Sequence, residues 1–208
     1  MYNETALYHQ NMEKIPHIIH YCWFGRNPKS ELVLNCIESW KKYLPGYEIR
    51  EWNEDNYDVT QVNFVKEAYE NQKWAFVSDY ARIDIINEYG GIYMDTDVEL
   101  IKSLDGFLNQ KMFCGWEERD AYYIKRNPNY ENSVNTGLGF GAEAKNPILI
   151  DILEFYNKLS FYNGDGSLNL IACPHYQTQI MKKYGLDDTK RTYQKLEFCT
   201  VYPEDYFS

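Results

Sequence analysis

Two aspartates, Asp95 and Asp97, are the residues of this 208-residue chain whose type and spacing best suit chemistry. They follow the apolar residues 92–94, which come directly after two glycines at 90–91. Side chains alternate along a strand, so we expect Tyr93, Asp95 and Asp97 to face the same way. Two carboxylates on one face repel each other unless a cation lies between them, and Mn²⁺ or Mg²⁺ suits such oxygen ligands. The spacing therefore predicts a metal site at this pair.

The segment before the glycines supplies a second group of polar residues. Its apolar spacing predicts a helix over residues 74–89, ended by the two glycines. Ser78, Asp79 and Arg82 then share one face, and the Asp79 and Arg82 side chains lie one turn apart. Alone, such a pair is typical of a weak ion pair on a helix surface. Because an acidic strand follows at once, we interpret the pair as part of the same site.

A strand, a helix and a second strand must hold these residues in place. Residues 15–25 form an apolar run ending in glycine, which predicts a buried strand. Asn27-Pro28 can cap and open a helix that continues to about residue 44. Residues 47–52 then predict a second strand, and residues 63–71 a further helix. This order is typical of an α/β domain with a parallel sheet, in which ligands bind at the carboxyl ends of strands.

The second half of the chain continues the same pattern. We expect a strand at residues 112–116, a glycine-rich stretch at 135–141 and a helix at 146–159. A short helix at 174–184 and a last strand at 196–202 complete the fold. No repeat, linker or low-complexity tract interrupts the sequence, which favours one domain.

Composition narrows the functional classes. The net charge of −10 disfavours nucleic acid as a partner and requires local cations for any anionic ligand. The aromatic content of 17% includes 20 tyrosines, which suit a surface that handles sugars and bases. The five cysteines have no metal-type spacing and no leader precedes them, so we expect reduced, buried thiols in a cytoplasmic protein. Charges interrupt every apolar run before it reaches the length of a membrane span.

Several motifs, taken together, carry a resemblance to a known family. They are Ile15 to Gly25, Ile37-Glu38-Ser39-Trp40, Glu51-Trp52-Asn53, Ser78-Asp79-Tyr80-Ala81-Arg82, Gly90 to Asp97 and Asn135 to Gly141. With them the chain resembles the glycosyltransferases with a DXD sugar-binding motif (family thirty-two). Their members include capsular polysaccharide synthesis transferases and the initiating α-mannosyltransferases of yeast glycans. The chain is also similar to the catalytic domain of large bacterial glucosylating toxins, and the resemblance covers about residues 15–205.

The resemblance implies a GT-A-type α/β fold with a mostly parallel central sheet flanked by helices. It implies a UDP- or GDP-sugar donor, Mn²⁺ or Mg²⁺, retention of anomeric configuration and a saccharide or lipid-linked acceptor, as in capsular or surface polysaccharide synthesis. One domain would span residues 1–208, with an arm at 1–14, a nucleotide-sugar-binding part at about 15–115 and an acceptor-side part at about 116–208. The enzyme would be cytoplasmic, and a lipid-linked acceptor would bring it to the inner face of the membrane.

The resemblance also assigns roles on the donor side. Trp23 would stack on the nucleobase, against the alternative of a core tryptophan. Asp79 and Arg82 would contact the sugar and the diphosphate, in the region that also contains Ser78 and Tyr93.

The metal and the acceptor side follow from the same resemblance. Asp97 would bind the metal directly, and Asp95 would hold ribose, sugar or a metal-bound water. With Arg82, the pair would form the catalytic group, which meets the charge on the departing nucleoside diphosphate. Asn135 and Gly137 would line the acceptor side.

Retention and the metal shell leave open points. A double displacement needs a carboxylate on the far face of the sugar, and Glu117 and Glu118 are near only in sequence, so we expect front-face attack through an oxocarbenium-like state. Relatives continue into a segment with a histidine near the metal, whereas His175, the only histidine after Asp97, comes too early. A truncated chain, a shell completed by water and weak activity are the three explanations.

Two other classes of function stay open. Phosphatases with an aspartyl-phosphate nucleophile also use Asp-x-Asp after an apolar strand. They place it near the N-terminus and need a later lysine and acidic pair, for which Asp187-Asp188 is the one loose candidate. A non-catalytic module that binds sugars or nucleotides is the third interpretation.

Overall fold

The structure, a computed structural model, describes residues 13–118 and 132–207. Its strands are β1 (Ile18–Cys22), β2 (Glu48–Trp52), β3 (Gly91–Tyr93), β4 (Met112–Trp116), β5 (Val134–Asn135), β6 (Phe140–Ala142), β7 (Gln194–Lys195) and β8 (Thr200–Tyr202). Its α-helices are α1 (Glu31–Tyr43), α2 (Asn63–Glu70), α3 (Trp74–Tyr89), α5 (Pro147–Tyr156) and α6 (Cys173–Lys182). Among the described residues, the short 3₁₀ helices η2 (Asp105–Phe107) and η3 (Glu204–Tyr206) follow β3 and β8.

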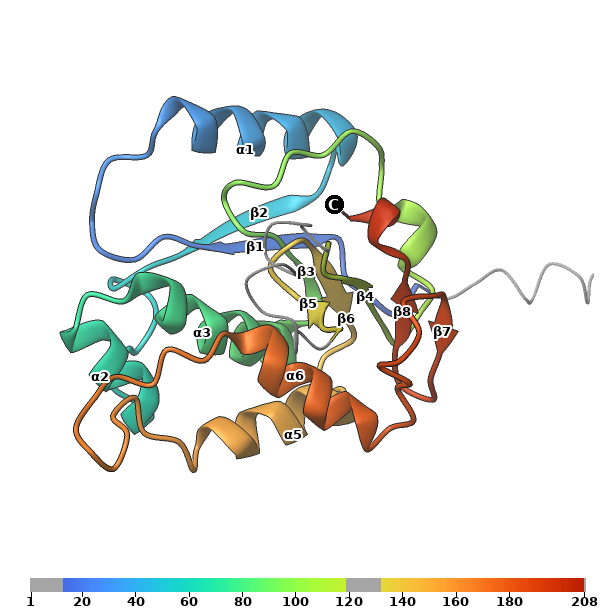
Figure 1. Cartoon of the computed structure of the whole chain (residues 1–208). Coiled ribbons are helices and arrows are strands. Elements are labelled where there is room, and N and C mark those ends of the chain that lie inside the picture. The colour runs from blue at the N-terminus through green and yellow to red at the C-terminus, as the bar shows by residue number, and fades with distance from the viewer. Residues whose placement is uncertain (1–12, 119–131, 208) are drawn as a thin grey trace, which may run out of the picture.

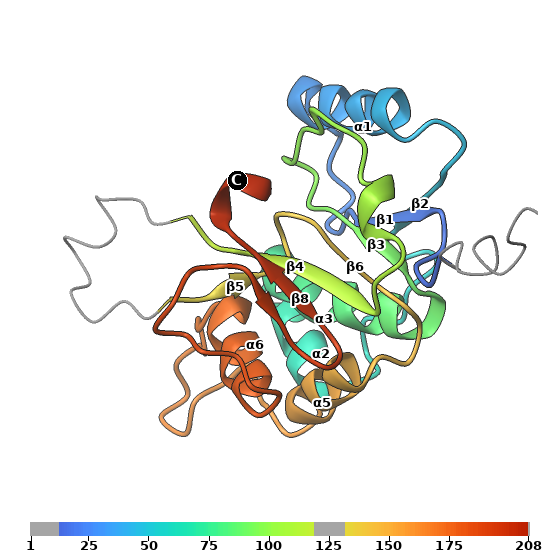
Figure 2. The same ribbon diagram turned by 90° about the vertical axis from the view of Figure 1, so that its right-hand side faces the viewer.

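One sheet connects both halves of the described chain, in the order β2-β1-β3-β6-β4-β8-β7, with β5 paired to β4. β1 pairs in parallel with β2 and β3, and β4 with β8, while β6 runs antiparallel between β3 and β4. Figure 2 shows β4, β6 and β8 side by side in this sheet. Strands β1, β2, β3, β4 and β8 thus share one direction, which confirms the predicted α/β fold with a mostly parallel sheet.

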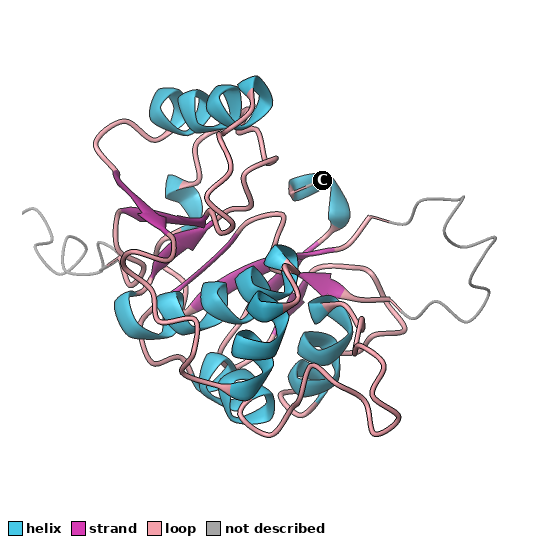
Figure 3. Cartoon of the chain, turned by 90° about the vertical axis from the view of Figure 1, so that its left-hand side faces the viewer, coloured by secondary structure: helices cyan, strands magenta, loops and turns pink. Residues whose placement is uncertain are grey.

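Helices cover the two faces of the sheet unequally. In Figure 1, α1 lies above the sheet and α2, α3, α5 and α6 lie below it, and Figure 3 shows the same division from the side. Ile92 and Met94 pack on the α1 side with Trp40, whereas Tyr93 packs on the other side with Val77. Successive side chains along β3 therefore pack into the apolar layers on opposite faces of the sheet, as expected for a strand buried on both faces.

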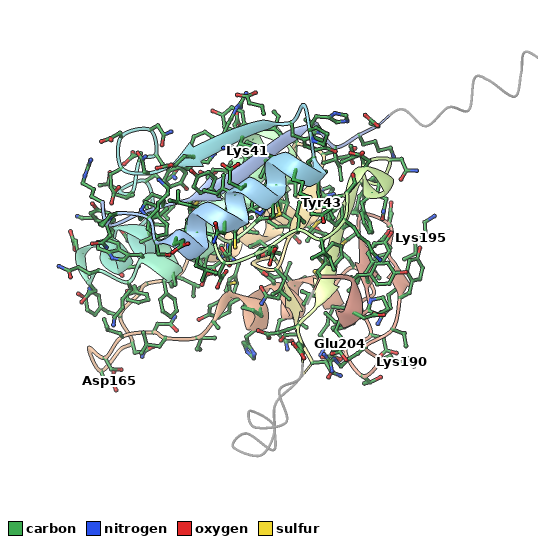
Figure 4. The ribbon with its side chains drawn as sticks, turned by 90° about the horizontal axis from the view of Figure 1, so that it is seen from above. Lys41, Tyr43, Asp165, Lys190, Lys195 and Glu204 are labelled. Atoms are coloured by element: carbon green, nitrogen blue, oxygen red, sulfur yellow. The ribbon has the colours of Figure 1, made fainter. Side chains whose placement is uncertain are left out.

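Figure 4 shows the molecule from above with its side chains drawn as sticks. Lys41 and Tyr43 lie on α1, Lys190 and Lys195 lie on the side of β7 and β8, and Asp165 projects from the loop before α6.

No helix in the described ranges has the length and apolarity needed to cross a membrane. All five cysteines are buried and none is in a disulfide, which agrees with the prediction of unpaired thiols.

Two of the wrong predicted boundaries lie next to the residues expected to form the site. The first helix does not open at Asn27-Pro28: it begins at Glu31, and Ser30 caps it by accepting from the Val33 N–H at 3.4 Å. The Asn27 carbonyl instead accepts a bond from the Trp23 indole at 2.7 Å, so this segment belongs to the loop after β1. The acidic strand is also shorter than predicted, because β3 ends at Tyr93.

Most other elements agree with the sequence. α3 has the predicted bounds, β2 and α2 differ by one residue at one end, and α5 begins at Pro147 with the Asn146 side chain as its cap. The predicted last strand is shorter, as β8, and pairs with β7 as a hairpin. Most of the predicted arm, residues 1–12, lies outside the described residues, as does most of the segment between Glu117 and Asn135, residues 119–131.

Candidate active site

The carboxyl ends of several strands meet at one edge of the sheet, as the fold class requires. Trp23 directly follows β1, Asp95 comes two residues after β3, and Glu117 directly follows β4. The stretch that leads from β5 into β6 reaches the same edge, because β6 runs in the opposite direction between β3 and β4. This edge therefore collects most of the side chains that the sequence singled out.

A buried arginine between two aspartates is at the centre of this edge. Arg82 Nη2 lies 3.0 Å from Asp95 Oδ1 and 3.2 Å from Asp79 Oδ1. The guanidinium also donates from Nε to the Ser78 carbonyl at 3.2 Å, and the Arg82 side chain is only 5% exposed. The predicted neighbours Asp79 and Arg82 do pair, but the alternative of a surface ion pair is wrong, because α3 turns this face inward.

Tyr93 completes the arrangement around Asp95. Its hydroxyl donates to Asp95 Oδ1 at 3.0 Å, and its ring lies under the Arg82 guanidinium, 5.0 Å from the carbon at its centre. Burial raises the pKa of Asp95, while the nearby Arg82 charge and the Tyr93 hydrogen bond act in the opposite direction. Burial likewise raises the pKa of Asp79, again opposed by Arg82.

Asp97 has a different environment from Asp95. The backbone turns after β3, with the Val98 N–H bonded to the Asp95 carbonyl at 3.1 Å, so Asp97 lies in a turn and is exposed. The prediction of two carboxylates on one strand face is therefore wrong in its geometry. The turn separates a partly buried carboxylate, fixed by Arg82 and Tyr93, from an open one.

The glycine-rich stretch packs directly against this pair. The Gly137 carbonyl accepts from the Asp95 N–H at 3.1 Å, and the Gly137 N–H donates to Asn135 Oδ1 at 2.7 Å. A Cβ at position 137 would lie 2.3 Å from Asp95 Oδ2 and 2.9 Å from Arg82 Nη1. Only glycine allows this close approach, and its need here is steric rather than conformational.

Asn135 connects this contact to the end of β4. Its amide nitrogen donates to Glu117 Oε1 at 3.3 Å, and Ser133 Oγ donates to Glu117 Oε2 at 2.8 Å. The structure thus brings Asn135, Gly137 and Glu117 to the same edge as Asp95. The sequence showed only that Glu117 follows the predicted strand at residues 112–116, and gave no sign that its side chain lies near Asp95.

Trp23 borders a separate depression beside the centre. This depression has a volume of about 260 Å³, and its lining also includes Arg26, Lys29, Glu51 and Asn53. The Lys29 ammonium lies 5.7 Å from the Trp23 ring and 2.7 Å from Glu51 Oε2. Trp23 is half-buried, so the alternative of a fully buried core tryptophan does not hold.

A divalent cation fits this edge with few protein ligands. Among residues 13–118 and 132–207, no group of three or more His, Cys, Asp or Glu side chains could hold a metal ion. Asp97 is open, whereas Asp95 Oδ1 is already bonded to Arg82 and Tyr93. Mg²⁺ commonly binds one or two carboxylates and takes its other ligands from water and substrate phosphates. The donor set therefore suits a cation held by Asp97, with Asp95 beside it.

Residues from α6 also reach the centre, and the sequence analysis missed them. The Asp79 carboxylate accepts hydrogen bonds from the thiol and the backbone N–H of Cys173, and Arg82 Nη1 lies 4.0 Å from Cys173 Sγ. Burial raises the pKa of this thiol well above its ordinary value. The separation of 91 residues between Arg82 and Cys173 leaves no local signal for the contact.

Comparisons with known proteins indicate the class of protein that this chain is similar to. Residues 30–114 match the family "Glycosyltransferase sugar-binding region containing DXD motif", and Asp95 and Asp97 lie within the matched range. Over 188 residues, the chain is 32% identical to inositol phosphoceramide mannosyltransferase 1 of Schizosaccharomyces pombe, which covers 84% of this chain. The chain spans 54% of that relative's length.

A solved structure, the PaToxG glycosyltransferase, has a similar fold. Its TM-score is 0.57 at 18% identity, over 82% of this chain and 70% of that one. At this identity the likeness concerns the fold alone. Residues 30–114 therefore match the glycosyltransferase sugar-binding region with a DXD motif, and the fold that surrounds them is of the GT-A type.

Proposed function

We propose that the protein is a metal-dependent glycosyltransferase that transfers a hexosyl group from a nucleotide-diphosphate sugar to an acceptor. The observation that carries the proposal is Arg82, buried between Asp79 and Asp95 and next to the open Asp97 turn, at the carboxyl edge of a GT-A-type sheet. The 32% identity to a mannosyltransferase supports this class of reaction.

The donor would lie along the edge from Trp23 to Asp95. Trp23 would stack on the nucleobase, a role supported by its position in the lining of the depression of about 260 Å³, which Lys29 also lines. Asp97, with Asp95 close by, would hold Mn²⁺ or Mg²⁺. When bound, such an ion acts as a Lewis acid toward the departing diphosphate.

Arg82 has a more specific role in this proposal than a direct contact with the diphosphate. Its side chain is 5% exposed and its donors face Asp95, Asp79 and the Ser78 carbonyl. A buried carboxylate tends to take up a proton, and an adjacent guanidinium counters this tendency. Arg82 therefore keeps Asp95 ionised and oriented, and Tyr93 fixes the same oxygen.

The acceptor would approach from the side of Asn135 and Gly137. We propose a saccharide or glycolipid acceptor, as in capsular or surface polysaccharide synthesis, and a cytoplasmic location with contact to the membrane through the acceptor. The name of the relative, inositol phosphoceramide mannosyltransferase 1, supports a mannosyl donor and a lipid-linked acceptor for this chain too.

We propose retention of anomeric configuration by front-face attack. Glu117 is a further carboxylate at this edge, and its oxygens accept hydrogen bonds from Asn135 and Ser133. In this proposal Glu117 therefore orients residues of the acceptor side and does not act as a nucleophile. An oxocarbenium-like state therefore accounts for retention without a protein nucleophile.

The phosphatase alternative has less support. It requires a second acidic pair, but Asp187 bonds Thr189 and Lys190 within its own loop, and Asp188 pairs with Lys182 at 2.7 Å. These carboxylates hold the loop before β7. A non-catalytic binding module is the second alternative, and a measurement of turnover distinguishes it from an enzyme.

The experiment that tests the proposal is hydrolysis and transfer of UDP- and GDP-sugars with Mn²⁺, measured beside a phosphomonoester panel. Asp97→Asn should lower turnover roughly a hundredfold or more, the scale for loss of a major electrostatic stabiliser. Asp165→Asn removes one charge from an exposed loop and serves as the matched control. Wild-type turnover and unchanged metal dependence in Asp97→Asn would sink the site assignment, and donor binding without turnover would support the binding module.

A further inference from the structure

Helix α6 has a polar face that is buried in the protein. Cys173 and Gln177 lie on it one turn apart, Thr178 directly follows Gln177, and all three are at most 3% exposed. Buried polar side chains cost free energy unless they are hydrogen-bonded. The partners of these three side chains are therefore informative about what the helix holds.

The partners belong to the stretch that forms the site. Gln177 Nε2 lies 3.0 Å from Thr136 Oγ1, and Thr136 Oγ1 lies 3.2 Å from Gln177 Oε1. Thr178 Oγ1 accepts from the Val134 N–H at 3.0 Å. The helix thus holds the residues on both sides of Asn135.

Thr136 is directly followed by Gly137, where the fit is tightest. The Gly137 carbonyl accepts from the Asp95 N–H at 3.1 Å, and a Cβ there would meet Asp95 Oδ2 at 2.3 Å. A shift of this stretch by a fraction of an ångström would move either the Asp95 backbone or its carboxylate. The orientation of Thr136 therefore controls the position of Asp95.

The Gln177–Thr136 hydrogen bond fixes the orientation of both side chains more than it stabilises the fold. A neutral hydrogen bond contributes little net stability, and replacing both partners by apolar groups of similar shape is often nearly neutral. In a fully buried pair, however, the bond restricts each side chain to one orientation. A leucine and a valine could fill the same space without fixing where residue 137 lies.

We propose that Gln177 is a positioning residue, which acts through Thr136 to hold Gly137 against Asp95. The inference rests on the proposed function, because Asp95 is the group whose position matters. The start of the same helix bonds Asp79 through Cys173, so α6 holds the glycine-rich stretch and the Asp79–Arg82 pair in register with each other.

The test uses Gln177→Leu, Thr136→Val and the double variant in the full chain. Amide hydrogen exchange at Asp95 and Gly137, followed by NMR, should rise roughly fivefold, the factor that corresponds to one neutral hydrogen bond. The double variant should show no further rise, because both changes remove one interaction. Thr136→Ser keeps the hydroxyl and should exchange like the wild type.

Tyr176→Phe is the matched control on the same helix. It removes the hydroxyl of another buried polar pair, Tyr176–Asn169, which has no contact with Thr136. It should lower stability to a similar degree and leave exchange at Asp95 and Gly137 unchanged. Equal exchange in Gln177→Leu and Tyr176→Phe would overturn the proposal.

Activity gives the second readout. In Gln177→Leu, kcat for the sugar donor should fall roughly tenfold, while binding of Mn²⁺ with GDP or UDP weakens less, because misplacement affects the reacting geometry most. Unchanged kcat together with faster exchange would overturn the positioning role. If the wild type turns over no donor, the proposed function fails, and the exchange data still decide whether Gln177 holds the stretch.

Discussion

A single methyl group added at Gly137 should disable the site without disturbing the fold. The backbone at this position has no positive φ, so alanine meets no conformational penalty. Its Cβ would nevertheless lie 2.3 Å from Asp95 Oδ2, 2.9 Å from Arg82 Nη1 and 3.0 Å from Asn135 Oδ1. Gly137→Ala therefore tests the close packing around Asp95 directly.

The size of the effect follows from the distances. To move from 2.3 Å to an ordinary contact of 3.4 Å, Asp95 Oδ2 and Cβ must separate by about 1.1 Å. The Arg82–Asp95 bond of 3.0 Å cannot survive a displacement of that size. Misplacement of about 1 Å costs roughly a hundredfold in rate, and overpacking costs about 1–3 kcal/mol of stability.

The assay is donor turnover with Mn²⁺, combined with the free energy of unfolding in urea. Gly106→Ala is the matched control, because no atom lies within 4 Å of its added Cβ and its φ is also not positive. It should keep wild-type turnover and equal or exceed wild-type stability. Wild-type turnover in Gly137→Ala would refute the view that Asp95 must hold its position.

The remaining predictions concern protonation and the nucleobase. Burial lowers the pKa of His20 to about 4, so the folded protein keeps this side chain neutral. The unfolded chain takes up the proton near pH 6.5. The free energy of unfolding should therefore be highest above pH 6.5 and fall by about 3 kcal/mol as the pH falls to 4. Urea unfolding at several pH values measures this loss, which should remain in the exposed-site control His17→Gln because that variant keeps His20. Burial raises the pKa of Asp79 and Asp95. As the pH is lowered, binding of Mn²⁺ with GDP or UDP should therefore already weaken at pH values above the ordinary carboxyl pKa of about 3.9. Binding that weakens only below that pH would contradict the assignment. Trp23→Leu should weaken nucleotide binding roughly fivefold or more in calorimetry, and equal affinity would exclude base stacking there.

The sequence predicts elements well where local signals agree. The helix over 74–89 has a regular apolar stripe and two glycines at its end, and the structure gives those bounds. The helix start at Asn27-Pro28 was wrong because the deciding interaction is tertiary: the Trp23 indole takes the Asn27 carbonyl. Likewise, no pattern in residues 91–98 shows that the chain turns after Tyr93.

The candidate site divides in the same way. Asp79 and Arg82 lie on one helix, so their pairing follows from helical spacing, whereas burial of the pair depends on packing by distant segments. In the sequence, Gly137 stands out only as part of a glycine-rich stretch. Its contact with Asp95 joins residues 42 positions apart, so no local pattern predicts it. Gln177 carried no signal at all, since a glutamine in a helix is usually exposed.

The charges at this edge determine what the proposed anionic donor would meet in this acidic chain. Two carboxylates, Asp79 and Asp95, share the charge of the Arg82 guanidinium, and the exposed Asp97 lies two residues after Asp95. A nucleotide diphosphate would therefore meet net negative charge unless a cation arrives with it. In the proposed function a metal ion at Asp97 would neutralise both partners at once, so the ion and the donor would favour each other's binding by the same factor. The buried Arg82 would then keep Asp95 ionised, a role that needs no contact between Arg82 and solvent.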